Sequence, residues 1–302
     1  MLKYKEKMEI KKIIWIVFLP LLVLVLIPNS LSQYNFEYKN VTSRVNVTNA
    51  FPTILTVDVD QDITLNAGGN KRVYCNTTIR DWNGWNDIDF VNATLYHSSS
   101  THGSVSNGNA HYTNTSCENT GNDGEYITEF SCSFDLIHYA NNGTWTCNVT
   151  AQDLYGFTDN LSNVTTVNEL YALNVTDLID YGDLAVTDTS SEVTSVITNF
   201  GNMNIGVSVL GYGLVEGDGY GLICERGGNI GVEFQRFSSV SGGSWNDKTP
   251  LNVSNQDLGI MIPQANDSSA PTFADIFWQL YVPPNPQGEC NGTVRFTATP
   301  YI

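Results

Sequence analysis

The stretch Ala140-Asn141-Asn142-Gly143-Thr144-Trp145-Thr146-Cys147-Asn148-Val149-Thr150-Ala151 decides the fold. It opens with turn-forming residues and continues with a strict alternation of side chains. One set comprises Trp145, Cys147, Val149 and Ala151; the other comprises Thr146, Asn148 and Thr150. Successive side chains of a β-strand point to opposite faces of the sheet. The stretch therefore predicts a strand with one face in a core and the other in water.

A second stretch, Arg72–Ile79, repeats this pattern. Its predicted inner set is Val73, Cys75, Thr77 and Ile79; its outer set is Tyr74, Asn76 and Thr78. Similar runs separated by Gly, Asn, Asp and Ser continue from Val45 almost to the end, without a sustained helical period. We therefore expect an all-β chain. The expected strands are Ile54–Val59, Arg72–Ile79, Ile88–Tyr96, Ile127–Phe134, Thr144–Ala151, Leu170–Val175, Glu192–Asn199, Ile205–Leu210, Val232–Phe237, Phe277–Val282 and Gly292–Thr299.

The chain has six cysteines, an even number that predicts disulfides if the protein is exported. They are Cys75, Cys117, Cys132, Cys147, Cys224 and Cys290. No two of them have the C-x-x-C spacing of a zinc site, and the spacing alone does not choose a pairing.

The run from Ala140 to Cys147 resembles the strand of immunoglobulin domains that carries their second cysteine. The resemblance implies a Cys75–Cys147 bridge, with Trp82 or Trp85 as the buried indole packed on it, and a more peripheral Cys117–Cys132 link. In that family a tyrosine hydroxyl two residues before the cysteine ties the corner of the fold. Here that residue is Trp145, which has only an N–H donor, so we do not expect the corner bond.

Two runs in the second half, Ile197–Ile205 and Ile276–Ala298, resemble β-sandwich modules of prokaryotic, especially archaeal, secreted surface proteins. An Asn-x-Gly-Asn turn separates two strands in such modules. The resemblance implies a building-block or adhesive domain, which Cys224–Cys290 would close. About 270 residues follow residue 32, more than one ordinary sandwich needs, so we expect two tandem immunoglobulin-like β-sandwich domains after an N-terminal signal or anchor helix. We place the domains at residues 33–168 and 169–302, because Leu161–Glu169 lies between two strand clusters and carries a glycan acceptor.

Residues 1–32 predict export. Five lysines and two glutamates precede an apolar run, Ile13 to Ile27, of about 15 residues, shorter than the roughly 20 that cross a bilayer. Ser30-Leu31-Ser32 then offers small residues before Gln33. A cleaved signal peptide is the first interpretation; an uncleaved membrane anchor and a pilin-type signal cut before Ile13 are the alternatives. All three place the rest of the chain outside the cell.

Thirteen Asn-x-Ser/Thr sequons follow this segment, whereas random placement of 33 Asn and 52 Ser or Thr in 302 residues gives about six. The excess predicts a glycosylated surface. The acceptors are Asn40, Asn46, Asn76, Asn92, Asn114, Asn142, Asn148, Asn160, Asn163, Asn174, Asn252, Asn266 and Asn291.

The net charge of −17 excludes most partners that carry phosphate. Loss of residues 1–32 would remove five positive and two negative charges and bring the charge to −20. Such a surface repels nucleic acid and anionic lipid, so a membrane contact is expected only through an uncleaved N-terminal segment. Divalent cations and basic partners fit better.

Asp81, Asn83, Asp87 and Asp89 concentrate oxygen ligands around a glycine turn, as extracellular calcium loops do. Calcium is therefore the one cofactor considered, although a hydrogen-bonded turn without metal explains the same residues. The four histidines lack the spacing of a metal site and are interpreted as polar loop residues; no nucleophile or phosphate-binding motif is present.

Three functions are compatible with these features. The first is a non-enzymatic structural or adhesion protein of the cell surface, such as an envelope or surface-layer component, whose partners are other surface proteins or its own copies. The second is a filament subunit assembled by strand donation, for which Tyr34–Val47 offers alternating apolar residues. The third is a carbohydrate-binding module or a glycan-active enzyme.

Overall fold

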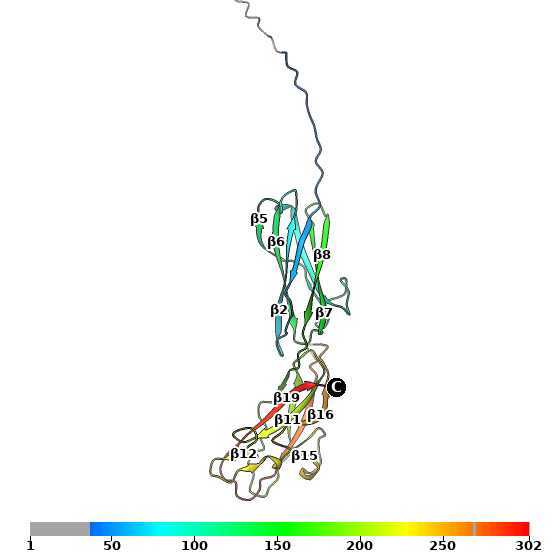
Figure 1. The fold of residues 1–302 in the computed structure, drawn as a ribbon. Coiled ribbons are helices and arrows are strands. Elements are labelled where there is room, and N and C mark those ends of the chain that lie inside the picture. The colour runs from blue at the N-terminus through cyan, green and yellow to red at the C-terminus, as the bar shows by residue number, and fades with distance from the viewer. Residues whose placement is uncertain (1–36, 268–269, 302) are drawn as a thin grey trace, which may run out of the picture. The chain divides into compact units, whose positions relative to one another are not determined.

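The computed structural model describes residues 37–267 and 270–301, which form β-strands, turns and three short 3-10 helices (Figure 1). The chain divides into two compact units, residues 1–48 and 49–302, and residues 37–48 contain no strand. No helix of the described residues is long and apolar enough to span a membrane. The predicted signal or anchor segment, residues 1–32, lies outside the described residues. The all-β expectation is confirmed, because the strands pair into antiparallel sheets.

Residues 53–167 form two four-stranded sheets whose orders are β1-β2-β6-β5 and β4-β3-β7-β8 (Figure 1). The strands of the first sheet are β1 (Thr53–Val59), β2 (Asn70–Arg80), β6 (Ile127–Ile137) and β5 (Glu118–Asp123). The strands of the second are β4 (His111–Asn114), β3 (Ile88–His97), β7 (Gly143–Asp153) and β8 (Thr158–Val167). Apolar side chains of both sheets share one core, so this half is a β-sandwich.

The inner faces of β2 and β7 are the ones that the alternation of side chains in the sequence predicted. Cys75 and Cys147 are fully buried and form a disulfide between the two sheets. Asn76 is exposed and Asn148 half-buried on the opposite faces. A second disulfide joins Cys117, just before β5, to Cys132 of β6. Both bridges are the pairs that the immunoglobulin resemblance implied.

The expected role of Trp82 or Trp85 as the core indole is wrong, since these side chains are 60% and 40% exposed. The buried indole is Trp145, which is 0% exposed and lies in the same core as the Cys75–Cys147 bridge. Its Nε1 donates to the backbone oxygen of Asn141 over 2.8 Å. The corner bond that we did not expect is therefore made, with an indole in place of a phenol.

The sequence suggested that the segment around Asn163 lies between the two domains. In the structure it is part of the first sandwich. Residues 158–167 form β8, which pairs with β7 from Gly143↔Val167 to Gln152↔Thr158. Val167 is buried, and the hydroxyl of Thr165 donates to the carbonyl of Asp60. The pattern was missed because the outer face of this edge strand is rich in Asn, Ser and Thr, which also dominate loops.

The second half contains three small sheets, ordered β15-β14-β17-β10-β9, β16-β11-β19 and β13-β12-β18. The first has β15 (Thr249–Pro250), β14 (Gln235–Ser238), β17 (Phe273–Leu280), β10 (Val193–Asn199) and β9 (Leu173–Val175). The others have β16 (Gln256–Ile262), β11 (Ile205–Tyr212), β19 (Thr293–Pro300), β13 (Ile230–Gly231), β12 (Tyr220–Cys224) and β18 (Cys290–Asn291). The 3-10 helices are η1 (Trp85–Asp87), η2 (Val232–Phe234) and η3 (Trp245–Asp247).

A core around Trp278 and Ile262, both fully buried, joins the five-stranded sheet to the sheet β16-β11-β19. A smaller cluster around Leu222 and Leu280 includes the third disulfide, Cys224–Cys290. The expected strand Val232–Phe237 is only partly correct, because Val232–Phe234 form η2 and β14 begins at Gln235. The phenyl ring of Phe237 packs on the indole of Trp278, with 5.5 Å between ring centroids.

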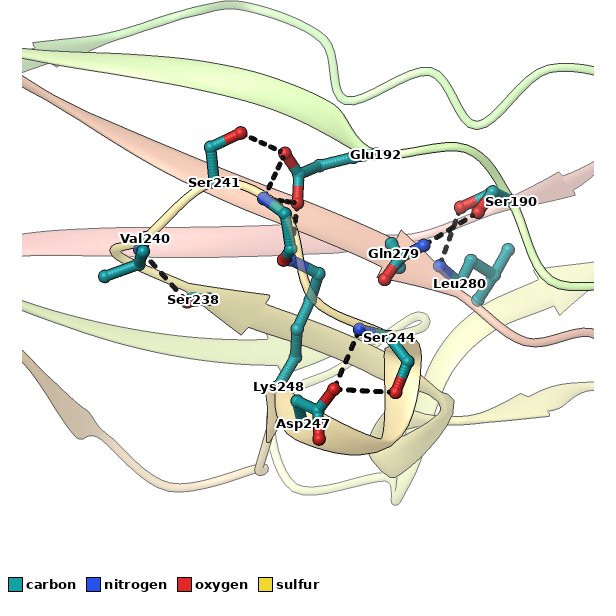
Figure 2. Close-up of polar contacts among 11 residues, drawn as sticks. Ser190, Glu192, Ser238, Val240, Ser241, Ser244, Asp247, Lys248, Gln279 and Leu280 are labelled. Atoms are coloured by element: carbon teal, nitrogen blue, oxygen red, sulfur yellow. Dashed lines mark hydrogen bonds and ion pairs between the residues drawn. The ribbon is translucent and has the colours of Figure 1, made fainter.

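A partly buried ion pair joins Glu192, which precedes β10, to Lys248, which precedes β15. The side chain of Lys248 is 1% exposed, and its Nζ lies 2.6 Å from Oε2 of Glu192. Figure 2 shows the Glu192 carboxylate facing both Lys248 and the hydroxyl of Ser241. The bond from Lys248 holds the pKa of Glu192 below its ordinary value. In the same loop, Ser244 and Asp247 form a capping box at η3 (Figure 2).

The Asn199-Phe200-Gly201-Asn202 turn connects β10 to β11 and also contacts the first sandwich. Asn202 is 1% exposed and donates its side-chain amide to the carbonyls of Ala140 and Asn168. Its Oδ1 accepts the backbone N–H of Leu170. A Cβ at Gly201 would stand 2.0 Å from the oxygen of Leu170, so only glycine fits. The sequon at Asn163 therefore does not prevent a packed junction.

Candidate metal centre

Three buried aspartates meet at one end of the first sandwich. Asp81 continues the inner face of β2 beyond Ile79, and Asp153 continues the inner face of β7 beyond Ala151. Asp87 ends η1 immediately before β3, where Ile88 pairs with Asp153. One carboxylate oxygen from each of the three lies within 4.8 Å of the others. The exposed fractions of Asp81, Asp87 and Asp153 are 0%, 8% and 1%.

The turn that leads from Asp81 to Asp87 is built from local backbone bonds. The N–H of Gly84 donates to the carbonyl of Asp81, and the N–H of Asp87 donates to that of Gly84. Gly84 has a φ of 118°, which disfavours residues with a Cβ. Asn83 donates its N–H to Oδ1 of Asp81, and its own Oδ1 accepts the N–H of Ala50. The turn thus holds two carboxylates on the same side.

Asp153 organises the following turn. Its Oδ1 accepts the backbone N–H groups of Tyr155 and Phe157, and its Oδ2 accepts the side-chain amide of Asn49 over 2.7 Å. The N–H of Leu154 donates to the carbonyl of Asp87, which ties this turn to η1. Three segments far apart in the chain, at residues 49, 81–87 and 153, therefore converge on one point.

The centre places three carboxyl groups close together where they are buried away from water. Burial raises the pKa of Asp81, and the nearby carboxylate of Asp153 raises it further, against the N–H bond from Asn83. Burial also raises the pKa of Asp87, as do the charges of Asp81 and Asp153. The three ion pairs of the described residues, Arg72–Asp135, Lys248–Glu192 and Arg295–Glu216, all lie elsewhere.

The oxygen cluster differs from the one that the sequence suggested. Asp81 and Asp87 belong to it, whereas the side-chain oxygen of Asn83 is already engaged with Ala50 and Asp89 is exposed on β3. The sequence interpretation missed Asp153, although this residue is the next inward-facing position of the strand after Trp145, Cys147, Val149 and Ala151. Asp81 stands six residues after Cys75, and Asp153 six after Cys147, so the disulfide between these strands aligns both carboxylates at the same end.

One other interpretation changes with the structure. His111 is not a loop residue, since it begins β4 and is 1% exposed. The glycine-rich run at 217–221 is held by the carboxylate of Asp218, which accepts the backbone N–H groups of four residues. Those bonds, led by that from Leu214, lower the pKa of Asp218 to about 2. The four residues that donate their backbone N–H groups to Asp218 are Gly213, Leu214, Val215 and Tyr220.

No protein-family model matches this chain, and no curated protein matches its sequence. Distant likenesses to solved β-proteins exist. One is the CsuC–CsuE chaperone–tip adhesion subunit complex from archaic chaperone-usher Csu pili of Acinetobacter baumannii, at 10% identity and a TM-score of 0.39 over 80% of this chain and 99% of that one. Another is the BspA C-terminal domain of Streptococcus agalactiae, at 11% identity and 0.21 over 83% and 96%. At these scores nothing about function follows.

Proposed function

We propose that this chain is a non-enzymatic, N-glycosylated structural or adhesion protein of the cell surface, built from immunoglobulin-like sandwiches. Support for an extracellular location comes from the three disulfides, since such bridges persist in oxidising compartments. The sheet orders β1-β2-β6-β5 and β4-β3-β7-β8, bridged from β2 to β7, match the arrangement of immunoglobulin domains.

The observation that carries the proposal is the distribution of glycan acceptors over the folded surface. Each of the thirteen sequon asparagines is exposed or half-buried, and none is buried. They occupy both halves of the chain but leave residues 177–251 free of sequons. Within that stretch, Leu214, Val215 and Val240 are 74%, 65% and 70% exposed. We assign this unglycosylated stretch as the contact surface for other surface proteins or further copies.

The loop that carries Leu214 and Val215 is suited to that role. Asp218 accepts the backbone N–H groups of both residues through its carboxylate, so that their side chains project from an ordered backbone. An ordered loop loses less conformational entropy when a partner binds than a flexible one does. Exposed apolar side chains supply the area that the partner would cover.

Peptide mapping of secreted protein tests the assignment, because it reports cleavage, disulfides and glycan occupancy together. We expect a product lacking residues 1–32 or retaining an anchor, with all six cysteines bridged and several sequons occupied. Recovery of a reduced and unmodified chain would contradict the proposal. Crosslinking on cells should map contacts to residues 177–251, and Leu214→Asp should reduce these crosslinks while Leu154→Asp, also on an exposed leucine, should not.

A filament subunit assembled by strand donation is the second candidate. Residues 37–48 form no strand, and Tyr38, Val41, Val45 and Val47 are each about four-fifths exposed or more. Such a segment can add to the sheet edge of another copy. The test is the N-terminus of the mature protein together with electron microscopy of shed material. A start at Ile13 favours a pilin-like filament, a start at Gln33 permits strand donation, and the absence of filaments removes this candidate.

A further inference from the structure

The acidic centre has unsatisfied ligand atoms. The Oδ2 atoms of Asp81 and Asp87 are shielded from solvent and have no hydrogen-bond partner in the structure, and the same holds for Oδ1 of Asn49. Buried polar atoms in folded proteins are nearly always paired. A carboxylate that is both buried and unpaired is costly, because it has lost its hydration shell and gained nothing in exchange. A cation bound between two such carboxylates and the third would pair these oxygens and offset the repulsion between the charges.

The cluster is small enough for its three oxygens to bind a single cation, and the donor chemistry favours one ion. Calcium binds oxygen at about 2.3–2.6 Å, so two oxygens on opposite sides of the ion are about 4.8 Å apart. The three carboxylate oxygens lie within 4.8 Å of one another. Magnesium needs about 2.0–2.1 Å and near-octahedral geometry, and zinc prefers nitrogen and sulfur. An all-oxygen set with a side-chain amide nearby is the donor chemistry that calcium uses.

We propose that Asp81, Asp87 and Asp153 bind a calcium ion, with the amide oxygen of Asn49 as a further ligand and water completing the shell. The site is independent of the function assigned above. It would join the start of the sandwich at residues 49–50 to the turn before β3 and the turn after β7. These are segments that the disulfides do not connect directly.

Bound calcium would also fix a set of exposed aromatic residues, because each ligand lies close in sequence to one. Trp82 and Trp85 lie within the Asp81–Asp87 turn. Phe51 lies two residues after Asn49, and Phe157 lies four residues after Asp153. The centroids of these two rings are 4.2 Å apart. The indole of Trp82 lies 5.4 Å from the ring of Tyr126. Since Trp82 and Trp85 are exposed, their fluorescence provides a direct signal of ion binding.

The experiment titrates CaCl2, and separately MgCl2, into the EDTA-treated full-length protein while recording tryptophan fluorescence and thermal unfolding. Asp87→Asn tests the site, and Asp89→Asn is its matched control, because Asp89 is two residues away, carries the same charge and lies outside the cluster. Calcium should change the fluorescence of the wild-type protein with a dissociation constant of about 0.1–1 mM, the range of extracellular modules. It should raise the unfolding temperature by about 2–8 °C.

Asp89→Asn should respond as the wild type does, whereas Asp87→Asn should bind calcium at least tenfold more weakly. In EDTA, Asp87→Asn should unfold at a higher temperature than the wild type, because it removes one of three repelling charges. A variant that is more stable than the wild type in EDTA but gains less from calcium indicates a metal site. If Asp87 had only a structural role, Asp87→Asn would be less stable than the wild type both in EDTA and in calcium. Equal responses of the two variants, an equal effect of magnesium, or no calcium effect at 10 mM, about tenfold above the weakest expected dissociation constant, would overturn the proposal.

Discussion

The indole Nε1 of Trp145 donates a hydrogen bond to the backbone oxygen of Asn141, four residues earlier, over 2.8 Å. Trp145 is fully buried, and its ring contacts those of Tyr112 and His97. The bond fixes the turn that enters β7, the strand that carries Cys147. Asn141 also accepts a hydrogen bond from the side-chain amide of Gln264, in the second half of the chain, at its own side-chain oxygen. The Trp145–Asn141 bond therefore links the core of the first sandwich to a residue that contacts the second.

Trp145→Phe should destabilise the first sandwich. The substitution leaves the Asn141 carbonyl without its donor and a cavity beside Cys147, for a total of about 2–4 kcal/mol. Chemical denaturation of the purified protein measures this loss. Trp82→Phe is the matched control because Trp82 is exposed, and its effect should stay within about 0.5 kcal/mol. Equal effects of the two substitutions would show that the Trp145 bond contributes nothing.

The pair between the buried Lys248 and the half-buried Glu192 should respond asymmetrically to substitution. Glu192→Ala leaves the ammonium of Lys248 buried without its counter-charge and should cost about 3 kcal/mol. The double variant Glu192→Leu with Lys248→Met removes both charges and should recover most of that loss. Unfolding free energies of the wild type, both single variants and the double variant form a cycle that measures the coupling. A double variant as unstable as Glu192→Ala would contradict the argument.

Stability should fall in mild acid because of His111. Its burial, with a smaller effect of His102, lowers its pKa in the folded state below the ordinary value, and neither ring nitrogen has a hydrogen-bond partner among the described residues. The unfolded chain therefore takes up a proton first as pH falls below about 6.5, so the contribution to stability is complete above that pH and is lost below it. His111→Leu should remove this part of the pH dependence as the pH falls below about 6.5. Thermal unfolding across that range tests it.

The sequon at Asn163 should be occupied less often than that at Asn76. Nδ2 of Asn163 donates to the carbonyl of Val57 over 2.9 Å, in the contact between β8 and β1. A sugar attached to this nitrogen replaces one of its two N–H donors and must fit beside this contact, whereas Asn76 is exposed on the outer face of β2. Quantitative peptide mass spectrometry gives the occupancy of each site. Full occupancy at Asn163 with no loss of stability would show that the cross-strand bond is dispensable.

The sequence by itself determined the strands whose two faces differ. In Arg72–Ile79 and Thr144–Ala151 the alternation of side chains with water-facing Asn and Thr is a local property, so the inner and outer faces were predictable. It did not reveal β8 or β4, whose polar outer residues also fit a loop. Local pattern also could not choose between Trp82, Trp85 and Trp145 as the core indole, since burial depends on which residues the opposite sheet covers.

Only the tertiary structure decided the acidic centre. Asp81 and Asp87 are close in the chain and could be paired from sequence, but Asp153 and Asn49 reach them only through the register of β3 on β7 and the bridge between Cys75 and Cys147. Conversely, Asp89 is separated from Asp87 by a single residue, Ile88, yet it is exposed once β3 begins. Binding chemistry depends on distances between side chains, and those distances are set by the packing of segments remote in sequence.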